Sequence, residues 1–235
     1  MIRFLPLLLC VVISACSPVV VEAPTPQPVM QAAAPVTPRL SQRQAVDNFD
    51  FVVRRVKPVA EQFCRSSRQQ SNCDFQIVID TRAERGVNAF QTLDRAGRPV
   101  IGFTVPLIAE ARNRDELAFV MAHEAAHHIL GHIGRQQQNA AMGGLLVGAL
   151  AGALGATDIE SAQRIGATVG ARTYSKEFEL EADALGTRIA AAAGFDPLRG
   201  AEFFFRIPDP GDRFLGTHPP NAERVRTVQR VAAGL

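Results

Sequence analysis

The 235-residue sequence lacks a marked excess of charge of either sign. Its 25 Lys and Arg residues nearly balance its 23 Asp and Glu residues, and the formal net charge is +2. Proteins that bind nucleic acid through its phosphates usually carry a strong positive excess. The sequence therefore offers no electrostatic case for a nucleic-acid partner, and we expect none.

Internal repeats are missing as well, and the first hydrophobic run is short. This run, residues 4–13, follows Arg3 and has too few residues for an ordinary transmembrane helix, which needs about 20. The small residues Ser14 and Ala15 come next. A basic start, a short apolar run and small residues are together typical of a secretory signal. Residues 1–15 are therefore predicted to be a signal peptide.

The segment Ile13-Ser14-Ala15-Cys16 resembles a bacterial lipobox, in which the cysteine becomes the lipidated first residue. The alternative is a plain signal peptide with a chance cysteine. We favour lipidation of Cys16, because a Pro-rich tether, residues 16–39, begins there. An Asp after the cysteine would resemble an inner-membrane retention signal. The residue at this position is Ser17, which favours the outer membrane. The chain is thus expected on the periplasmic side of the envelope, lipid-anchored, with residues 40–235 as one domain.

Cysteines are few, four in the whole chain. Cys10 and Cys16 precede the domain, which leaves Cys64 and Cys73 within it. Export implies an oxidising compartment, where two cysteines nine residues apart are expected to form a disulfide. A zinc site built from these thiols is the alternative, but two cysteines without a nearby histidine cannot fill four coordination positions.

The domain is predicted to be α+β, mainly helical with one small sheet. Apolar spacing predicts one or two helices over residues 41–68, with a break at Pro58. Alternation and turn signals predict three strands, followed by a helix that Pro106 opens. Asp115 is expected to cap the next helix. The predicted strands are residues 74–81, 87–93 and 99–105. The later helices are residues 159–173, 175–193 and 221–233. A further helix starts at Asp196-Pro197 and carries the core phenylalanines 203–205.

A charge-free segment runs from residue 136 to residue 157, and residues 140–156 (AAMGGLLVGALAGALGA) are small and apolar throughout. They are fewer than the roughly 20 residues of a membrane span, and the glycines weaken a spanning helix. We favour a mobile hairpin or a buried helix. A membrane-touching element is the alternative, and the sequence leaves the role of this segment open.

The pentapeptide HEAAH, residues 123–127, brings three chemical groups together on one helix. Two histidines four residues apart project from the same face, so His123 and His127 can both reach one Zn²⁺ at about 2.0–2.1 Å. Glu124 follows the first histidine and can lie beside the metal without ligating it. There it can take a proton from a metal-activated water, as the general base of a peptidase does.

A catalytic zinc needs three protein ligands and one open position. The scheme HExxHxxGxxH would need Gly and His where this sequence has Leu130 and Ile133. The segment 175–183 (SKEFELEAD) offers carboxylates instead, and Glu179 and Asp183, four residues apart, share a face. One can ligate the metal while the other accepts a hydrogen bond from a ligand histidine. The alternative is that these carboxylates form a solvent-exposed acidic face of the helix. Because HEAAH is present in the same chain, we favour the interpretation as metal ligands.

Through HEAAH, EFELEADALG (residues 177–186) and THPPNAER (residues 217–224), the domain resembles the zinc metallopeptidases that include the CAAX prenyl endopeptidases and the HtpX-like proteases. The closest likeness is to their periplasmic lipoprotein members. The resemblance implies a zincin-type domain, with its small sheet beside the active-site helix and one Zn²⁺ per chain. It assigns the third ligand to Glu179, with Asp183 as its companion, and not to Glu177 or Glu181.

Other matches to the family imply roles for further residues. Asn88-Ala89-Phe90 matches a strand near the family's cleft, which implies contact with substrate. By the same resemblance His218 either completes the zinc shell in a closed state or steadies the oxyanion, and Arg224 supports His218 or binds substrate. A loop histidine without a role is the alternative for His218. Lys176 replaces the family's usual Arg before the acidic helix, and the helical repeats of some periplasmic relatives are missing, so partner binding through repeats is not expected.

His128 and His132 are also four residues apart, but no adjacent acid accompanies them. A shift of one residue rotates a side chain by about 100° on a helix. We therefore expect both to face away from the first pair and to lie off the metal.

These features predict a zinc-dependent endopeptidase of the bacterial cell envelope, with Glu124 and His218 as catalytic residues. The substrate would lie extended along an edge strand, 87–93 or 99–105, through main-chain hydrogen bonds. Folded chains rarely offer such a segment, so unfolded or misassembled envelope proteins are the expected substrates. The alternative is a zinc-stabilised periplasmic chaperone or assembly factor with little or no proteolysis.

Overall fold

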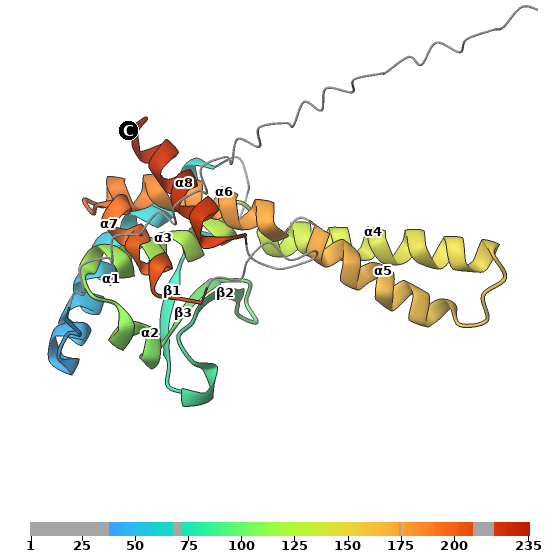
Figure 1. Cartoon of the computed structure of the whole chain (residues 1–235), viewed down its shortest axis with the longest axis horizontal. Helices are drawn as coiled ribbons and strands as arrows, with labels where there is room; N and C mark the ends of the chain where they lie inside the picture. Colours follow the sequence, from blue (N-terminus) through green and yellow to red (C-terminus); the bar gives the residue numbers. More distant parts are fainter. Residues whose placement is uncertain (1–37, 68–71, 174, 209–218) are drawn as a thin grey trace, which may run out of the picture. The chain divides into compact units, whose positions relative to one another are not determined.

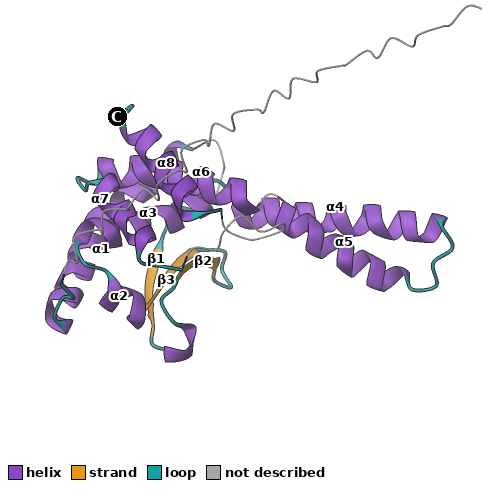
Figure 2. Cartoon of the chain, in the orientation of Figure 1, coloured by secondary structure: helices purple, strands orange, loops and turns teal. Residues whose placement is uncertain are grey.

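The computed structural model describes residues 38–67, 72–173, 175–208 and 219–235. Over these residues most of the chain is helical, and one small sheet lies along one side of the helices (Figure 2), so the predicted α+β class is confirmed. The signal segment, Cys16, most of the tether and His218 lie outside the described residues, so the predictions made for them stay predictions.

Helix α1, Gln42–Ser66, is one continuous helix. Ser41 caps it, since its side chain accepts the N–H of Gln44 while the Gln44 side chain reaches back to the Ser41 backbone. The predicted break at Pro58 is wrong. Proline removes one backbone hydrogen bond, but the apolar face continues past it and outweighs that loss. The buried residues of this face are Ala45, Phe49, Val52, Val56, Ala60 and Cys64.

A disulfide joins Cys64, near the end of α1, to Cys73, with the two Cα atoms 5.7 Å apart. It fastens the C-terminal end of α1 to the segment that leads into the sheet. Cys64 is fully buried and belongs to the hydrophobic core. The bridge therefore links the first helix to the first strand at a packed position.

The sheet has the strand order β1-β3-β2, where β1 is Gln76–Asp80, β2 is Ala89–Leu93 and β3 is Pro99–Thr104. Strand β3 pairs in parallel with β1 and antiparallel with β2. Both sides of β3 are therefore occupied, which excludes residues 99–105 as the edge strand for a substrate. Strand β2 remains as the edge. Phe90 lies over its cross-strand partner Gly102, where a Cβ would collide with the phenyl ring.

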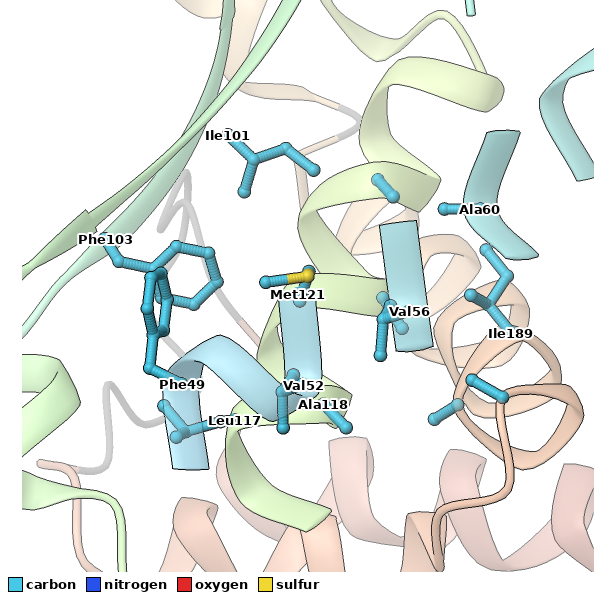
Figure 3. Packing of buried hydrophobic residues seen from close by; sticks show 14 of the residues in the cluster. Phe49, Val52, Val56, Ala60, Ile101, Phe103, Leu117, Ala118, Met121 and Ile189 are labelled. Atoms are coloured by element: carbon cyan, nitrogen blue, oxygen red, sulfur yellow. The ribbon is translucent and has the colours of Figure 1, made fainter. Parts of the chain in front are cut away.

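Helix α3, Arg114–Ile129, follows the short helix α2, Val105–Glu110, and lies at the centre of the domain. The predicted cap at Asp115 is wrong: Asn113 is the N-cap, and its side chain accepts the N–H of Glu116. Asp115 already lies in the first turn, where it accepts the N–H of Asp196. Figure 3 shows the core around α3, with Leu117, Ala118 and Met121 among Phe49, Val52, Val56, Ala60, Ile101, Phe103 and Ile189.

Helices α4, His132–Ala153, and α5, Ile159–Thr173, pack mainly on each other as a hairpin (Figure 1). Glycines form the seam between them, since a Cβ at Gly143 would meet the backbone of Gly166 and Gly170. The prediction that residues 140–156 form a hairpin by themselves is wrong, because residues 132–153 are one continuous helix and the second arm is α5. The buried helix is wrong as well, because small residues occupy the seam and larger ones face outward. The exposed apolar residues include Met142, Leu145, Leu146, Leu150, Leu154 and Ile165. Among the described residues, no helix combines the length and hydropathy that crossing a membrane requires.

Helix α6, Ser175–Ala192, packs along α3. It ends before Gly194, whose φ of 85° is a left-handed conformation that suits glycine. Asp196 then caps the short helix α7, Pro197–Ala201, as predicted. This helix ends before the phenylalanines 203–205, which lie in a 3-10 turn, Glu202–Phe205, so the predicted extent of the helix is wrong. The last helix, α8, is Asn221–Ala232 and packs on α6. Helix α6, which carries Glu179 and Asp183, therefore contacts both α3, which carries HEAAH, and α8, which carries Arg224.

Candidate metal centre

Two imidazoles and one carboxylate converge between α3 and α6. The Nε2 atoms of His123 and His127 are 3.0 Å apart. Glu179 of α6 lies opposite, with its carboxylate oxygens 3.6 Å from Nε2 of His123 and 3.3 Å from Nε2 of His127. One ligand atom from each residue lies within 4.8 Å of the others. Two nitrogens and one carboxylate oxygen are the donor set of a catalytic zinc site with an open position.

Close contact between the helices produces this convergence. Gly186, seven residues beyond Glu179 on α6, lies against the backbone of α3, and a Cβ at this position would lie 3.0 Å from the Cα and N atoms of His123. A side chain at this position would have to push α6 and α3 apart by a few tenths of an ångström. The glycine at the end of the EFELEADALG segment therefore helps to set the distance from Glu179 to the histidine pair.

Behind His123, a buried ion pair fixes the orientation of its ring. Nδ1 of His123 donates to Oδ1 of Asp183 at 2.9 Å, and Asp183 has no exposed surface. Arg224 of α8 donates to both Asp183 oxygens, at 2.7 and 2.8 Å. A metal ion bound at Nε2 would take the place of the proton there, while the ring keeps its Nδ1 proton for Asp183.

The electrostatics of the centre favour a cation. Burial alone would lower the pKa of His123, but hydrogen bonds to Asp183 and Glu179 outweigh it and raise that pKa to about 10. Burial alone would raise the pKa of Asp183, but Arg224 outweighs it and keeps Asp183 ionised. The surroundings thus stabilise positive charge at His123, as a metal-binding site must, and the residues present fit a divalent ion.

Two cavities meet at these residues, and Glu124 lines both of them together with His127 and Glu179. The larger, about 420 Å³, has a mainly apolar wall; the smaller, about 230 Å³, has a more polar one. Asn88 and Ala89 line the larger cavity and Gln91 the smaller, so edge strand β2 runs past both. A carboxylate that can act as a base therefore lies in the same cleft as the histidine pair.

The apolar wall contains phenylalanines for which the sequence favours a place in the core over one in a ligand cleft. Phe203 and Phe204 are buried, and they also line the larger cavity. Nothing in the local sequence separates a core phenylalanine from one that borders a cleft, because that depends on the distant helix it meets. The ring of Phe204 packs on Phe119 of α3 and lies under the guanidinium of Arg224.

The structure separates the other predicted site residues. Phe90 covers Gly102 and is not among the residues that line the cleft. Glu181 lies beside Arg135 rather than beside the histidine pair. His128 accords with its prediction, with its Nε2 2.7 Å from the carbonyl oxygen of Asn72. The predicted direction of His132 is wrong, because its Nδ1 is 2.8 Å from Nδ1 of His127. His132 is nevertheless not part of the group that could hold the metal, which is His123, His127 and Glu179.

The reason for the error at His132 is a break in the helix. Rotation by about 100° per residue holds only along one continuous helix. Helix α3 ends at Ile129, and Gly131, at φ 66°, turns the chain before α4 begins at His132. The new helix axis brings this side chain back against His127.

Comparison with known proteins identifies the family to which this site belongs. The sequence model of peptidase family M48 matches residues 52–232. The chain belongs to peptidase family M48. The matched residues are therefore a metallopeptidase domain. The chain is also 31% identical over 146 residues to a protein of Vibrio cholerae serotype O1 named beta-barrel assembly-enhancing protease. That match covers 58% of this chain and only 29% of the relative.

Replacing Arg224 by Ala should strongly destabilise this M48 domain. The change leaves the Asp183 carboxylate fully buried without its guanidinium, and breaking a buried pair in this way costs about 3–5 kcal/mol. The free energy of unfolding, from urea denaturation, measures the loss. Arg226→Ala, at an exposed position of the same helix, should change it by only about 0.5 kcal/mol. Equal losses in the two variants would contradict the role of the pair.

Proposed function

We propose that this M48 peptidase is a zinc-dependent endopeptidase of the bacterial cell envelope. The observation that carries the proposal is the approach of His123, His127 and Glu179 to within 4.8 Å, with Glu124 in the same cleft. These three residues would hold one zinc ion per chain. A bound zinc ion would lower the pKa of a water molecule and polarise the scissile carbonyl.

The side chains of the cleft have separate roles in the proposed reaction. Glu124 removes a proton from the attacking water and then delivers it to the leaving amine. Asp183 and Arg224 keep the His123 ring in one orientation, so that its Nε2 stays directed at the metal position. We keep His218 as a proposed stabiliser of the oxyanion or inhibitory ligand, on the family resemblance alone.

Strand β2 is the proposed docking strand for the substrate. It is an edge of the sheet and lies beside α3. An extended peptide that pairs with an edge strand gains main-chain hydrogen bonds irrespective of its sequence. Residues 88, 89 and 91 border the two cavities, so such a peptide would pass the catalytic carboxylate. This mode favours unfolded or misassembled proteins, because folded chains rarely offer a free extended segment.

The proposed location rests on the chain's first residues and on its relative. The signal-like residues 1–15, followed by Cys16, support export and a lipid anchor, and Ser17 supports the outer membrane. The relative in Vibrio cholerae is named for enhancing beta-barrel assembly, which supports envelope proteins as substrates. The chain spans about 29% of that relative's length, so its substrates and partners are carried over as proposals.

The test uses one substrate protein in folded form and in reduced, alkylated form. We expect the purified chain to cleave the unfolded form much faster, to lose cleavage when a chelator removes the metal, and to regain it with one equivalent of zinc. Cleavage that a chelator leaves untouched, with no metal in the protein, would contradict the proposed function.

A further inference from the structure

His127 has a second contact, on the side of its ring that faces away from His123. Its Nδ1 is 2.8 Å from Nδ1 of His132. On the far side of His132, Nε2 is 3.1 Å from a carboxylate oxygen of Glu181. The same oxygen accepts from Arg135 at 2.5 Å. Four side chains from α3, α4 and α6 thus form one line that starts at a ligand histidine.

Proton positions along this line follow from the contacts. An imidazole that ligates through Nε2 carries its proton on Nδ1, so His127 must donate to His132. Nδ1 of His132 is then the acceptor, and the proton of this ring lies on Nε2, where Glu181 accepts it. Every donor meets an acceptor in this arrangement. The opposite tautomer of His132 would set two N–H groups against each other at 2.8 Å.

Packing holds His132 in this orientation. Only 5% of its surface is exposed, and its ring stacks on Phe178 with centroids 4.6 Å apart and an angle of 11° between planes. The guanidinium of Arg135 also lies over Phe178, 4.2 Å from the ring centre, while it binds Glu181. The ring of His132 therefore has little freedom to turn its Nδ1 away from His127.

We propose that His132 is a positioning residue for the metal centre, which fixes the tautomer and orientation of His127 as Asp183 does for His123. The proposal rests on the proposed function, since it takes His127 as a ligand. The two ligand histidines, His123 and His127, differ in how they reach a carboxylate. His123 donates directly to a carboxylate, whereas His127 reaches the carboxylate of Glu181 through a neutral ring.

The consequence concerns metal affinity. Removal of a residue that orients a ligand histidine typically weakens metal binding about 10–100-fold. Replacement of His132 by Leu removes the acceptor, and this loss is expected. Replacement by Asn leaves a side-chain oxygen near the position of Nδ1, so His132→Asn should recover most of the affinity even though it loses contact with Glu181.

The experiment measures the zinc dissociation constant by competition with a chromophoric chelator, for wild type, His132→Leu, His132→Asn and His128→Leu. His128 is the matched control, because it is a neighbouring buried histidine that contacts a backbone carbonyl rather than a ligand. We expect unchanged affinity in His128→Leu. A wild-type dissociation constant in folded His132→Leu, or equal weakening in His132→Asn and His132→Leu, would overturn the proposal.

A second measurement needs no variant and holds even if His132→Leu does not fold. In zinc-loaded wild-type protein, nitrogen NMR of the imidazoles should find the proton of His132 on Nε2 and that of His127 on Nδ1. A proton on Nδ1 of His132 would overturn the proposal. Wild-type protein that binds no zinc in the chelator competition would instead overturn the proposed function, so the two failures are distinguishable.

Discussion

Replacing Glu124 by Gln should abolish proteolysis while leaving zinc bound. Glutamine has nearly the shape of glutamate but cannot take the proton of the attacking water. Loss of a general base costs about 10²–10⁴-fold in rate. The ligand atoms of His123, His127 and Glu179 are untouched, so the zinc content should equal that of wild type. The measurement is the rate of casein cleavage beside the zinc content of both proteins. Cleavage at the wild-type rate would show that the assigned mechanism is wrong.

The same variant separates a protease from a chaperone. A zinc-stabilised assembly factor would act through binding, and Glu124→Gln should still rescue a strain that lacks the gene. A protease requires hydrolysis, and we expect no rescue. Because the variant keeps its metal, a failure to rescue cannot be attributed to loss of the metal-bound fold.

The second large effect concerns two glutamates on one helix. Glu179→Gln should weaken zinc retention by more than the roughly 10–100-fold that outer residues contribute, because an anionic ligand becomes a neutral amide. Glu181→Gln should have a much smaller effect. Glu181 contacts Arg135 and His132 instead of the histidine pair, and the amide oxygen of glutamine can still accept from His132.

Zinc content after dialysis against a chelator compares these two variants under identical conditions. Both substitutions remove one negative charge from the same helix, so each controls for the other's change in net charge. Equal zinc content in the two purified variants would overturn the assignment of Glu179 as the ligand.

The part of the site that lies within one helical turn could be predicted from the sequence. A spacing of four residues places His123 with His127, and Glu179 with Asp183, on common faces whatever the tertiary structure. The pairing of these two faces depended on a family resemblance. Their distance depends on Gly186, whose contact with the α3 backbone no local pattern reveals.

Contacts between distant elements could not be predicted. Arg224 meets Asp183 across 41 residues of sequence, because α8 packs on α6. His132 was assigned the wrong direction because the glycine turn at Gly131 starts a new helix axis. Local propensity predicts a break at Pro58, but the buried face of α1 continues through this residue. In each case the outcome depended on where helices end and how they pack, which rules that hold within one element do not give.

The central claim is that one zinc ion lies between α3 and α6. Anomalous X-ray scattering at the zinc edge, from crystals of the active protein, locates that ion directly. The account predicts one peak per chain, at about 2.0–2.2 Å from Nε2 of His123, Nε2 of His127 and a carboxylate oxygen of Glu179. A peak at any other set of side chains, or active protein without a peak, would contradict it.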